Sequence, residues 1–249
     1  MIAPVEVDRP RRRGFRPHLA QTFGFLALLP ALLGLGVWQL HRAGQKADLS
    51  AALEEARLAP PLPIAELRPS GLPQRVRAAG QYDGRQLLLD NRISNGRAGY
   101  ELLAPLILKD APAVLIDLGW LPAGNDRHVL PQASVPTGQV QVTGLAIAPS
   151  PPPFELSDRQ AFGSGWPLVT ETAEPARIAA RLDYPLLPVL LYPDGSAAAD
   201  AQLAALTAFP PERHLAYAAQ WFGMALVLVL IYLRHGLRSR RTRSAEGSA

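Results

Sequence analysis

Two long apolar stretches lie near the two ends of this chain, and they set the limits on what it can fold into. Residues 19–40 and 215–233 contain no charged residue. At 1.5 Å of rise per residue, about 20 helical residues cross the hydrocarbon core of a bilayer. We therefore expect transmembrane helices at residues 18–40 and 215–233, with a single domain, residues 41–214, between them.

Arginine-rich tails flank both stretches on their outer sides. Residues 1–17 and 234–249 together carry ten arginines and three acidic residues. Positive charge beside a membrane span stays on the cytoplasmic side. We therefore expect both termini in the cytoplasm and the middle domain in the periplasm, in a bacterial inner membrane. The first stretch is expected to remain as an anchor, because it is long and no signal-peptide cleavage site follows it.

The net charge of +4 comes from the tails, since the middle domain has more acidic than basic residues. The basic balance therefore reports membrane orientation, and we expect membrane lipid but no nucleic acid among the partners. The chain has no cysteine, which excludes disulfides and thiolate-bound metals and leaves histidine and carboxylates as the candidate metal ligands.

The spacing of apolar residues changes along the middle domain. Helix-forming residues continue through 41–58 and stop before Pro60 and Pro61, which cannot extend a helix. A Pro-rich linker, residues 59–73, leads to a β-rich core, residues 74–210. Strands are expected at 75–82, 86–89, 100–108, 113–120, 139–144 and 189–192. A short helix is expected at 172–182, and a short helix or an ordered loop at 197–206. The second strand is expected to return from the first as a hairpin, and residues 91–99 are expected to form a loop. The predicted fold class is an α+β membrane protein, with two transmembrane helices flanking one barrel-like or sandwich-like external domain with minor helices.

The sequence of the middle domain contains no recognisable catalytic motif. His128 lies in a predicted loop, Ser94 and Ser164 lack a Gly-x-Ser-x-Gly frame, and no Gly-rich phosphate loop is present. We therefore expect a protein that is not an enzyme.

The inner ends of the two spans contain more candidate ligand-binding residues than the middle domain. His214, Tyr217, Ala218 and Trp221 follow the spacing i, i+3, i+4 and i+7, so a helix presents them on one face. An imidazole beside aromatic rings suits a planar, apolar, iron-containing ligand such as haem. The alternative is an interfacial histidine within an aromatic belt. On the first helix, Trp38 and Arg42 recur four residues apart, and Arg42 either holds anionic groups or extends to the membrane surface.

Five segments in order resemble the surfeit-locus cytochrome c oxidase assembly family, as a divergent bacterial member. They are LGVWQLHR at 35–42 followed by Lys46, GQY at 80–82, GYELLAPL at 99–106, VLIDLGWLP at 114–122 and HLAYAAQWFGMA at 214–225. The chain departs from the family at Asp117 and Leu118, where Asn-Arg is usual, and at residues 210–213, where acidic or amide residues are frequent.

The resemblance implies an assembly factor for haem–copper cytochrome c oxidase that binds haem a and assists its insertion into the large catalytic subunit. It implies His214 as the iron ligand. Tyr217, Trp221 and Trp38 would then pack against the haem, and Arg42 is a candidate for its propionates. The implied partners are the oxidase large subunit and haem A synthase, and no catalytic step falls on the chain itself.

Two alternatives remain open at this point. One is a membrane scaffold for oxidase assembly that never touches haem. The other is a two-span polysaccharide co-polymerase, whose external part would be dominated by long helices.

Overall fold

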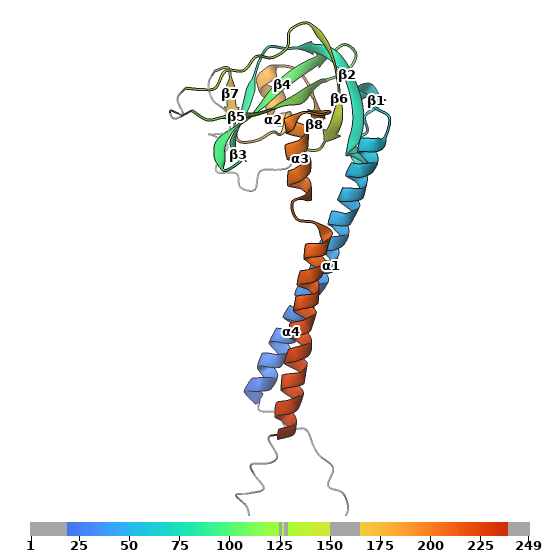
Figure 1. Cartoon of the computed structure of the whole chain (residues 1–249), viewed down its shortest axis with the longest axis vertical. Helices are drawn as coiled ribbons and strands as arrows, with labels where there is room; N and C mark the ends of the chain where they lie inside the picture. The colour runs from blue at the N-terminus through green and yellow to red at the C-terminus, as the bar shows by residue number, and fades with distance from the viewer. Residues whose placement is uncertain (1–18, 125, 127–128, 150–164, 239–249) are drawn as a thin grey trace, which may run out of the picture. The chain divides into compact units, whose positions relative to one another are not determined.

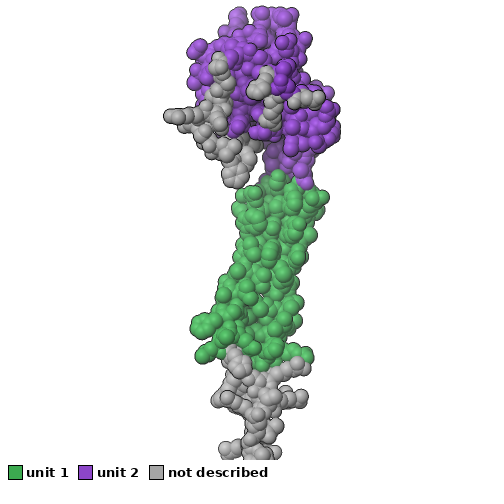
Figure 2. All heavy atoms as spheres, turned by 90° about the vertical axis from the view of Figure 1, so that its left-hand side faces the viewer, with its two compact units in different colours: residues 1–47, 209–249 green, residues 48–208 purple. Residues whose placement is uncertain are grey.

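The computed structural model describes residues 19–124, 126, 129–149 and 165–238. The chain divides into two compact units, residues 1–47 with 209–249 and residues 48–208 (Figure 2). Most of the predicted basic tails, together with His128 and Ser164, lie outside the described residues.

Two described helices are long and apolar enough to cross a membrane, one in Leu19–Leu58 and one within Ala197–Gly236. Only 6% and 11% of their apolar windows are buried within the protein, so neither is the core helix of a soluble domain. The first is α1 (Leu19–Leu58), which continues through the segment expected to be helical up to residue 58. The apolar part of the second is α4 (Pro211–Arg238). The predicted layout, two apolar spans flanking a β-rich domain, is confirmed.

Within the first unit, side chains join α1 and α4 at two levels. Toward the outer ends, the ring of Phe25 stacks on that of Tyr232 with 4.1 Å between centroids, and the Thr22 and Tyr232 hydroxyls lie 3.1 Å apart. Toward the inner ends, His214 bonds to Gln39. Small side chains let two helix backbones approach closely in a membrane. The buried Ala218 and Ala225 of α4 fit that pattern.

The second unit is built on one eight-stranded sheet (Figure 1). Its strands are β1 (Leu62–Pro63), β2 (Gln74–Tyr82), β3 (Leu87–Ser94), β4 (Arg97–Leu108), β5 (Ala113–Pro122), β6 (Gln139–Ile147), β7 (Leu168–Thr170) and β8 (Leu186–Pro193). The order is β1-β2-β6-β8-β5-β4-β3-β7, and β2 also pairs with β4. That additional pairing closes β2, β6, β8, β5 and β4 into a ring, so the domain is a barrel and not a sandwich.

The ring closes where Gly80 of β2 pairs with Leu108 of β4. A Cβ at Gly80 would meet the carbonyl oxygen of Ile107, so this close approach requires glycine. Elsewhere β2 alternates buried and exposed residues, with Val76 and Ala78 inward and Arg77 outward. Alternation of this kind predicted the strand correctly.

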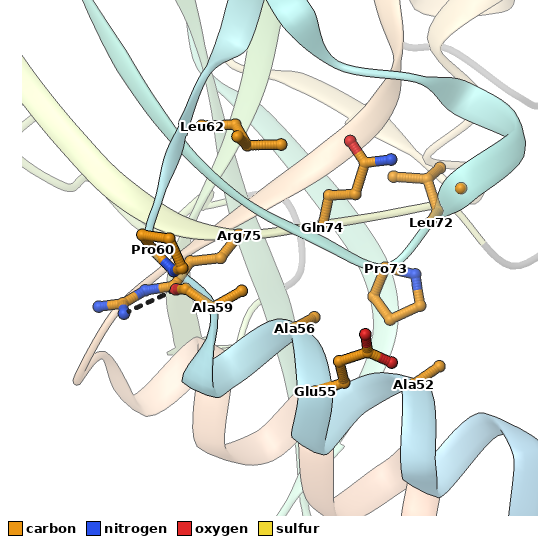
Figure 3. Close-up of a pocket in the computed structure, with 11 residues that line it drawn as sticks. Ala52, Glu55, Ala56, Ala59, Pro60, Leu62, Leu72, Pro73, Gln74 and Arg75 are labelled. Carbon is orange, nitrogen blue, oxygen red and sulfur yellow. Dashed lines mark hydrogen bonds between the residues drawn. The ribbon is translucent and has the colours of Figure 1, made fainter.

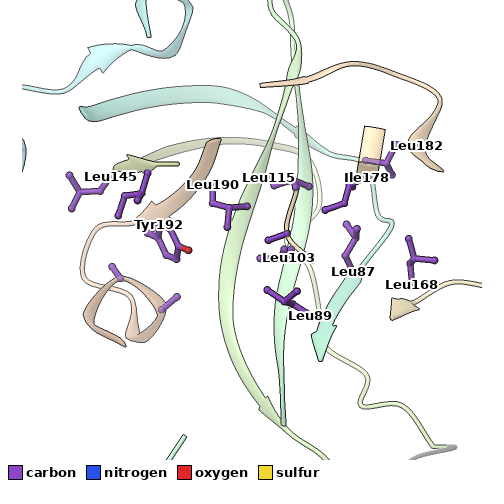
Figure 4. Close-up of a cluster of buried hydrophobic side chains, with 14 of the residues drawn as sticks. Leu87, Leu89, Leu103, Leu115, Leu145, Leu168, Ile178, Leu182, Leu190 and Tyr192 are labelled. Atoms are coloured by element: carbon purple, nitrogen blue, oxygen red, sulfur yellow. The ribbon is translucent and has the colours of Figure 1, made fainter. Parts of the chain in front are cut away.

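The barrel has apolar clusters on both of its faces. All five strands of the ring contribute to one cluster, which includes Val76, Leu106, Ile116, Ala146 and Leu191, and which fills the interior. The second cluster covers the outer face (Figure 4). It joins strand residues to the helices and is made up of Leu53, Ala56, Leu87, Leu89, Leu103, Leu115, Leu145, Ile147, Leu168, Ala173, Ile178, Leu182, Leu190, Tyr192, Ala198 and Ala199. Because both faces are covered, β5 is buried continuously from Ala113 to Asp117.

A short helix forms within residues 172–182, as predicted, and the segment expected to be a helix or an ordered loop is a helix. Helix α2 (Pro175–Leu182) has proline in its first turn, where the missing N–H costs nothing. Helix α3 (Ala197–Thr207) is capped by Ser196, whose hydroxyl accepts the N–H of Ala199 at 3.1 Å. Residues 59–73, expected as a linker, contain β1 and two 3₁₀ turns, η1 (Ile64–Glu66) and η2 (Pro69–Gly71).

The predicted hairpin of residues 75–82 with 86–89 is wrong. Strands β2 and β3 do not pair with each other; both lie antiparallel to β4, with β2 along Leu106–Leu108 and β3 along Arg97–Leu103. The Asp83 N–H donates to the carbonyl oxygen of Pro105, which keeps the chain beside β4. The Asp83-Gly84 pair therefore bends the chain without reversing it. After the bend, β3 continues beside the same strand, β4, along which β2 runs.

The predicted loop at residues 91–99 is also wrong, because β3 continues to Ser94 and β4 begins at Arg97. Asn91, at φ 60°, lies within a shift of the β3–β4 register and so bulges the strand. Asn95 and Gly96, at φ 50° and 73°, form the two-residue turn between the strands. An Asn-Gly turn is favoured because both central positions need positive φ.

Candidate functional site

The candidate site is built around His214 in the first turns of α4. Its ring lies in the contact between the two helices of the first unit, and only 9% of the residue is exposed. The Nδ1 atom lies 2.7 Å from Oε1 of Gln39 on α1. Ala218, one turn later on the same face, is also buried. Of the four residues that the sequence places on one face of α4, His214 and Ala218 are buried. Trp221 is only half-buried and Tyr217 is 45% exposed.

This hydrogen bond fixes the proton of the imidazole. An amide oxygen can only accept, so Nδ1 donates to Gln39 Oε1. In a neutral ring the lone pair then resides on Nε2. Histidine ligands of metals commonly show this arrangement, with one nitrogen bonded to a neighbouring oxygen and the other available to the metal.

An aromatic ring that sequence reasoning missed lies against His214. The ring of Phe209 approaches that of His214 edge-on, with centroids 4.6 Å apart, and is parallel to that of Tyr217 at 6.2 Å. The guanidinium of Arg213 lies 5.6 Å from the centre of the Phe209 ring. The signal is present in the sequence: α4 begins at Pro211, so Phe209 and His214 occupy the two positions of a hydrophobic staple.

The predicted residues of α1 are placed differently. Trp38 precedes Gln39 and is 51% exposed. Arg42 is exposed and donates from Nη1 to Oε1 of Gln45 at 3.0 Å, within its own helix. In the described part of the chain, the Phe209 ring contacts the rings of both His214 and Tyr217. The hydrogen bond of Arg42 goes to Gln45 and not to His214.

Comparison with known proteins identifies the family. A family model described as the SURF1 family matches residues 26–226. The chain belongs to the SURF1 family. The match runs from α1 to α4 and so includes both Gln39 and His214.

Similar proteins agree with this assignment. The chain is 26% identical to a SURF1-like protein of Rickettsia conorii, over 81% of this chain and 85% of the relative. It is also 26% identical to a SURF1-like protein of Rickettsia felis, over 81% and 90%. A SURF1-like protein of Mycobacterium bovis is 31% identical over 44% of this chain and 43% of its own length. The resemblance inferred from the five segments is confirmed. Membership supports a role in cytochrome c oxidase assembly, within a family of generally non-enzymatic assembly factors.

A cleft of about 350 Å³ in the second unit of this SURF1-family chain is a different kind of site (Figure 3). Alanine, proline and leucine side chains form most of its lining, and Glu55, Gln74 and Arg75 supply its polar side chains. Arg75 is engaged elsewhere, since Nη1 donates to the carbonyl oxygen of Ala59 at 3.4 Å and Nη2 lies 2.6 Å from Oδ2 of Asp194. The lining has no imidazole, so the cleft does not compete with His214 for iron.

The electrostatics of the second unit strongly perturb Asp117 on β5. This carboxyl group is fully buried, and its Oδ1 accepts the Gly119 N–H at 2.9 Å while Oδ2 has no hydrogen-bond partner. Burial, followed by the charge of Glu101, raises the pKa of Asp117 to about 7. Burial also raises the pKa of Glu101, although Arg92, 3.2 Å away, opposes that shift. Asp117 stands where the family usually has asparagine, which presents a neutral group of the same shape.

Proposed function

We propose that this chain binds haem a through His214 and assists its insertion into the large catalytic subunit of cytochrome c oxidase. The observation that carries the proposal is the state of the His214 ring. It is held between two helices with Nδ1 donating to Gln39, which leaves the Nε2 lone pair for a metal. A single imidazole of this kind is a common axial ligand of haem iron.

The surroundings of His214 suit such a cargo. Phe209 and Tyr217 supply flat apolar surface beside the imidazole, and Trp221 continues it along α4. Arg42 and Arg213 are cations at the same end of the helix pair, and guanidinium groups pair well with carboxylates such as propionates. Haem a is cargo in this proposal, and the chain performs no chemical step on it.

The proposed setting follows from the same assignment. Haem A synthase would supply the haem and the oxidase large subunit would receive it. The arginine-rich tails favour a bacterial inner membrane with both termini in the cytoplasm and the barrel in the periplasm.

Co-expression with haem A synthase tests the proposal. We expect the full-length chain, purified in detergent, to carry haem a with an absorption spectrum typical of a histidine-ligated iron. His214→Ala should lose this spectrum. His235→Ala is the matched control, because His235 is an exposed histidine of the same helix and should leave the haem content unchanged. Haem that persists unaltered in His214→Ala would remove His214 from the site.

A second candidate function is a scaffold for oxidase assembly that binds no haem. The observation that favours it is the packing of His214, whose ring is buried and lies against that of Phe209. In that case the wild-type chain should purify without haem even beside its synthase. Deleting it should lower the amount of oxidase while the remaining oxidase keeps its full haem a content.

The polysaccharide co-polymerase alternative requires an external part made of long helices. Within residues 48–208 the described elements are instead an eight-stranded sheet, the end of α1 and short helices. We therefore do not retain it.

A further inference from the structure

Gln39 and His214 face each other across the helix pair although 175 residues separate them in the chain. Gln39 is half-buried on α1 and His214 is buried on α4. The 2.7 Å between Oε1 and Nδ1 is short for a bond between neutral groups. It is also the hydrogen bond that joins the two helices at the level of the proposed iron ligand.

Small residues around the bond hold its two partners at this distance. Gly36 lies one turn before Gln39, and a Cβ there would come within 2.6 Å of Phe222 on α4. Ala218 lies one turn after His214 and is almost fully buried. Because α1 and α4 run antiparallel, Gly36 and Ala218 lie on the same side of the bond, where the two helices approach closely. Withdrawal of the Gln39 amide would leave a buried imidazole nitrogen unpaired.

The bond selects one of the two neutral forms of the ring. With Oε1 as a fixed acceptor, the proton belongs on Nδ1 and the lone pair on Nε2. An exposed histidine in water exchanges between both forms, so only part of its population presents Nε2 to a metal. A partner at Nδ1 also fixes the orientation of the ring, and loss of such a partner commonly weakens metal binding roughly 10–100-fold.

The identity of the partner matters as well as its presence. A carboxylate at this position would accept a stronger, charge-assisted bond and place more electron density on the imidazole. Hydrogen bonding to an axial ligand is one of the means by which a protein sets the reduction potential of haem iron. An amide is a weaker acceptor and keeps the pair uncharged at the edge of the bilayer.

We infer that Gln39 is a positioning residue for haem, which holds His214 as a neutral ligand with Nε2 presented and tunes the iron through that ring. The part of this inference that concerns haem rests on the proposed function. The form of the histidine ring can be measured without haem and tests it separately.

The experiment compares Gln39→Leu and Gln39→Glu with the wild-type chain. Gln45→Leu is the matched control, because Gln45 is a glutamine of the same helix that lies 3.2 Å from another histidine, His41. In the full-length chain in detergent and without haem, ¹⁵N NMR should show His214 protonated at Nδ1. Gln39→Leu should produce a mixture of the two ring forms, and Gln45→Leu should not alter His214.

With haem a supplied by its synthase, Gln39→Leu should bind roughly 10–100-fold more weakly. Gln39→Glu should retain the haem and lower its midpoint potential, an effect that a purely structural role would not produce. An unchanged affinity in Gln39→Leu, or an unchanged potential in Gln39→Glu, overturns the inference. So does a wild-type His214 protonated at Nε2 before haem binds. A chain that binds no haem, while its ring form depends on Gln39, instead overturns the proposed function and keeps the positioning of the ring by Gln39.

Discussion

Gly36 of α1 lies directly against the ring of Phe222 on α4, and a Cβ at residue 36 would come within 2.6 Å of Cε1 and 2.7 Å of Cζ of that ring. Gln39 follows Gly36 by one turn, so this contact sets the helix separation across which the Gln39–His214 bond forms. The absence of a side chain at residue 36 is therefore a condition for the candidate site.

We expect Gly36→Leu to force α1 and α4 apart. Overpacking of a close contact typically costs about 1–3 kcal/mol. The variant should melt at a lower temperature in detergent, and the ring form of His214 should become mixed as in Gln39→Leu. Gly34→Leu is the control, since a Cβ at Gly34 has nothing within 4 Å. Equal melting temperatures and equal His214 spectra in the two variants would contradict the proposed tight contact.

The buried Asp117 predicts a dependence of stability on pH. Its pKa rises from the ordinary 3.8 to about 7 in the folded chain, so between these values the folded state binds a proton that the unfolded state has lost. The free energy of unfolding should therefore fall as the pH rises from about 4 to 7, and the full penalty should remain above pH 7. At 1.36 kcal/mol per unit, the loss is on the order of 4 kcal/mol.

Asp117→Asn removes this ionisation, so we expect it to stabilise the chain at pH 8 and to flatten most of the slope. Unfolding followed by circular dichroism at several pH values measures both. The raised pKa of Glu101 leaves a residual slope of the same sign. Asp110→Asn, at an exposed aspartate, should behave like the wild type. A slope equally steep in Asp117→Asn would show that the acid responsible lies elsewhere.

The positions of most strands could be predicted because their signals are local. Val76 and Ala78 alternate with exposed residues, and the run from Ala113 onward is apolar without interruption. Pairing could not be predicted in the same way. Whether the chain after Asp83 turns back or continues beside β4 depends on contacts with Pro105 and Leu103, which lie about 20 residues later. The hairpin expectation failed because an Asp-Gly pair does not carry that information.

In the candidate site too, local signals could be predicted from the sequence, whereas contacts between distant segments could not. His214 could be selected because helical spacing groups it with Tyr217 and Trp221, and the Pro-Pro start of α4 also carries the signal for Phe209. Gln39 could not be selected as its partner. Its role depends on the rotation of α1 against α4, which the fit of Gly36 to Phe222 decides. Residues on the exposed side, such as Trp38 and Arg42, share the same motif in the sequence but not the same contact.

The contacts of Arg85 in the barrel domain predict that it stabilises the fold. Its Nε lies 2.5 Å from Oδ2 of Asp83, its Nη2 donates to the carbonyl oxygen of Leu182, and its guanidinium lies 5.4 Å from the ring of Trp166 and 5.1 Å from that of Tyr184. Burial opposes the charged form, but the hydrogen bond and charge of Asp83 raise the pKa of Arg85 above its ordinary value.

We expect Arg85→Met to lower the free energy of unfolding by about 1–3 kcal/mol, because it removes bonds to a carboxylate and a carbonyl together with the contact to two rings. Tyr184→Phe should cost about 1 kcal/mol, since it removes only the hydroxyl that donates to Asp83. Denaturant unfolding measures both, with Arg77→Met at an exposed position of β2 as the control. If Arg85→Met matched Arg77→Met, the cluster would contribute nothing to stability.

The proposed membrane orientation predicts which positions a reagent can reach from outside the cell. Because the chain has no cysteine, each introduced cysteine is a unique label. Ser70→Cys lies in the exposed turn η2 of the barrel domain, and Ser244→Cys lies in the C-terminal arginine-rich tail. In intact cells with a permeable outer membrane, a charged thiol reagent should label residue 70 and leave residue 244 unlabelled. Lysis should make both react. Labelling of residue 244 before lysis would contradict the proposed orientation, because it would place the C-terminal arginines outside the cytoplasm. The barrel would then meet its partners on the opposite side of the membrane.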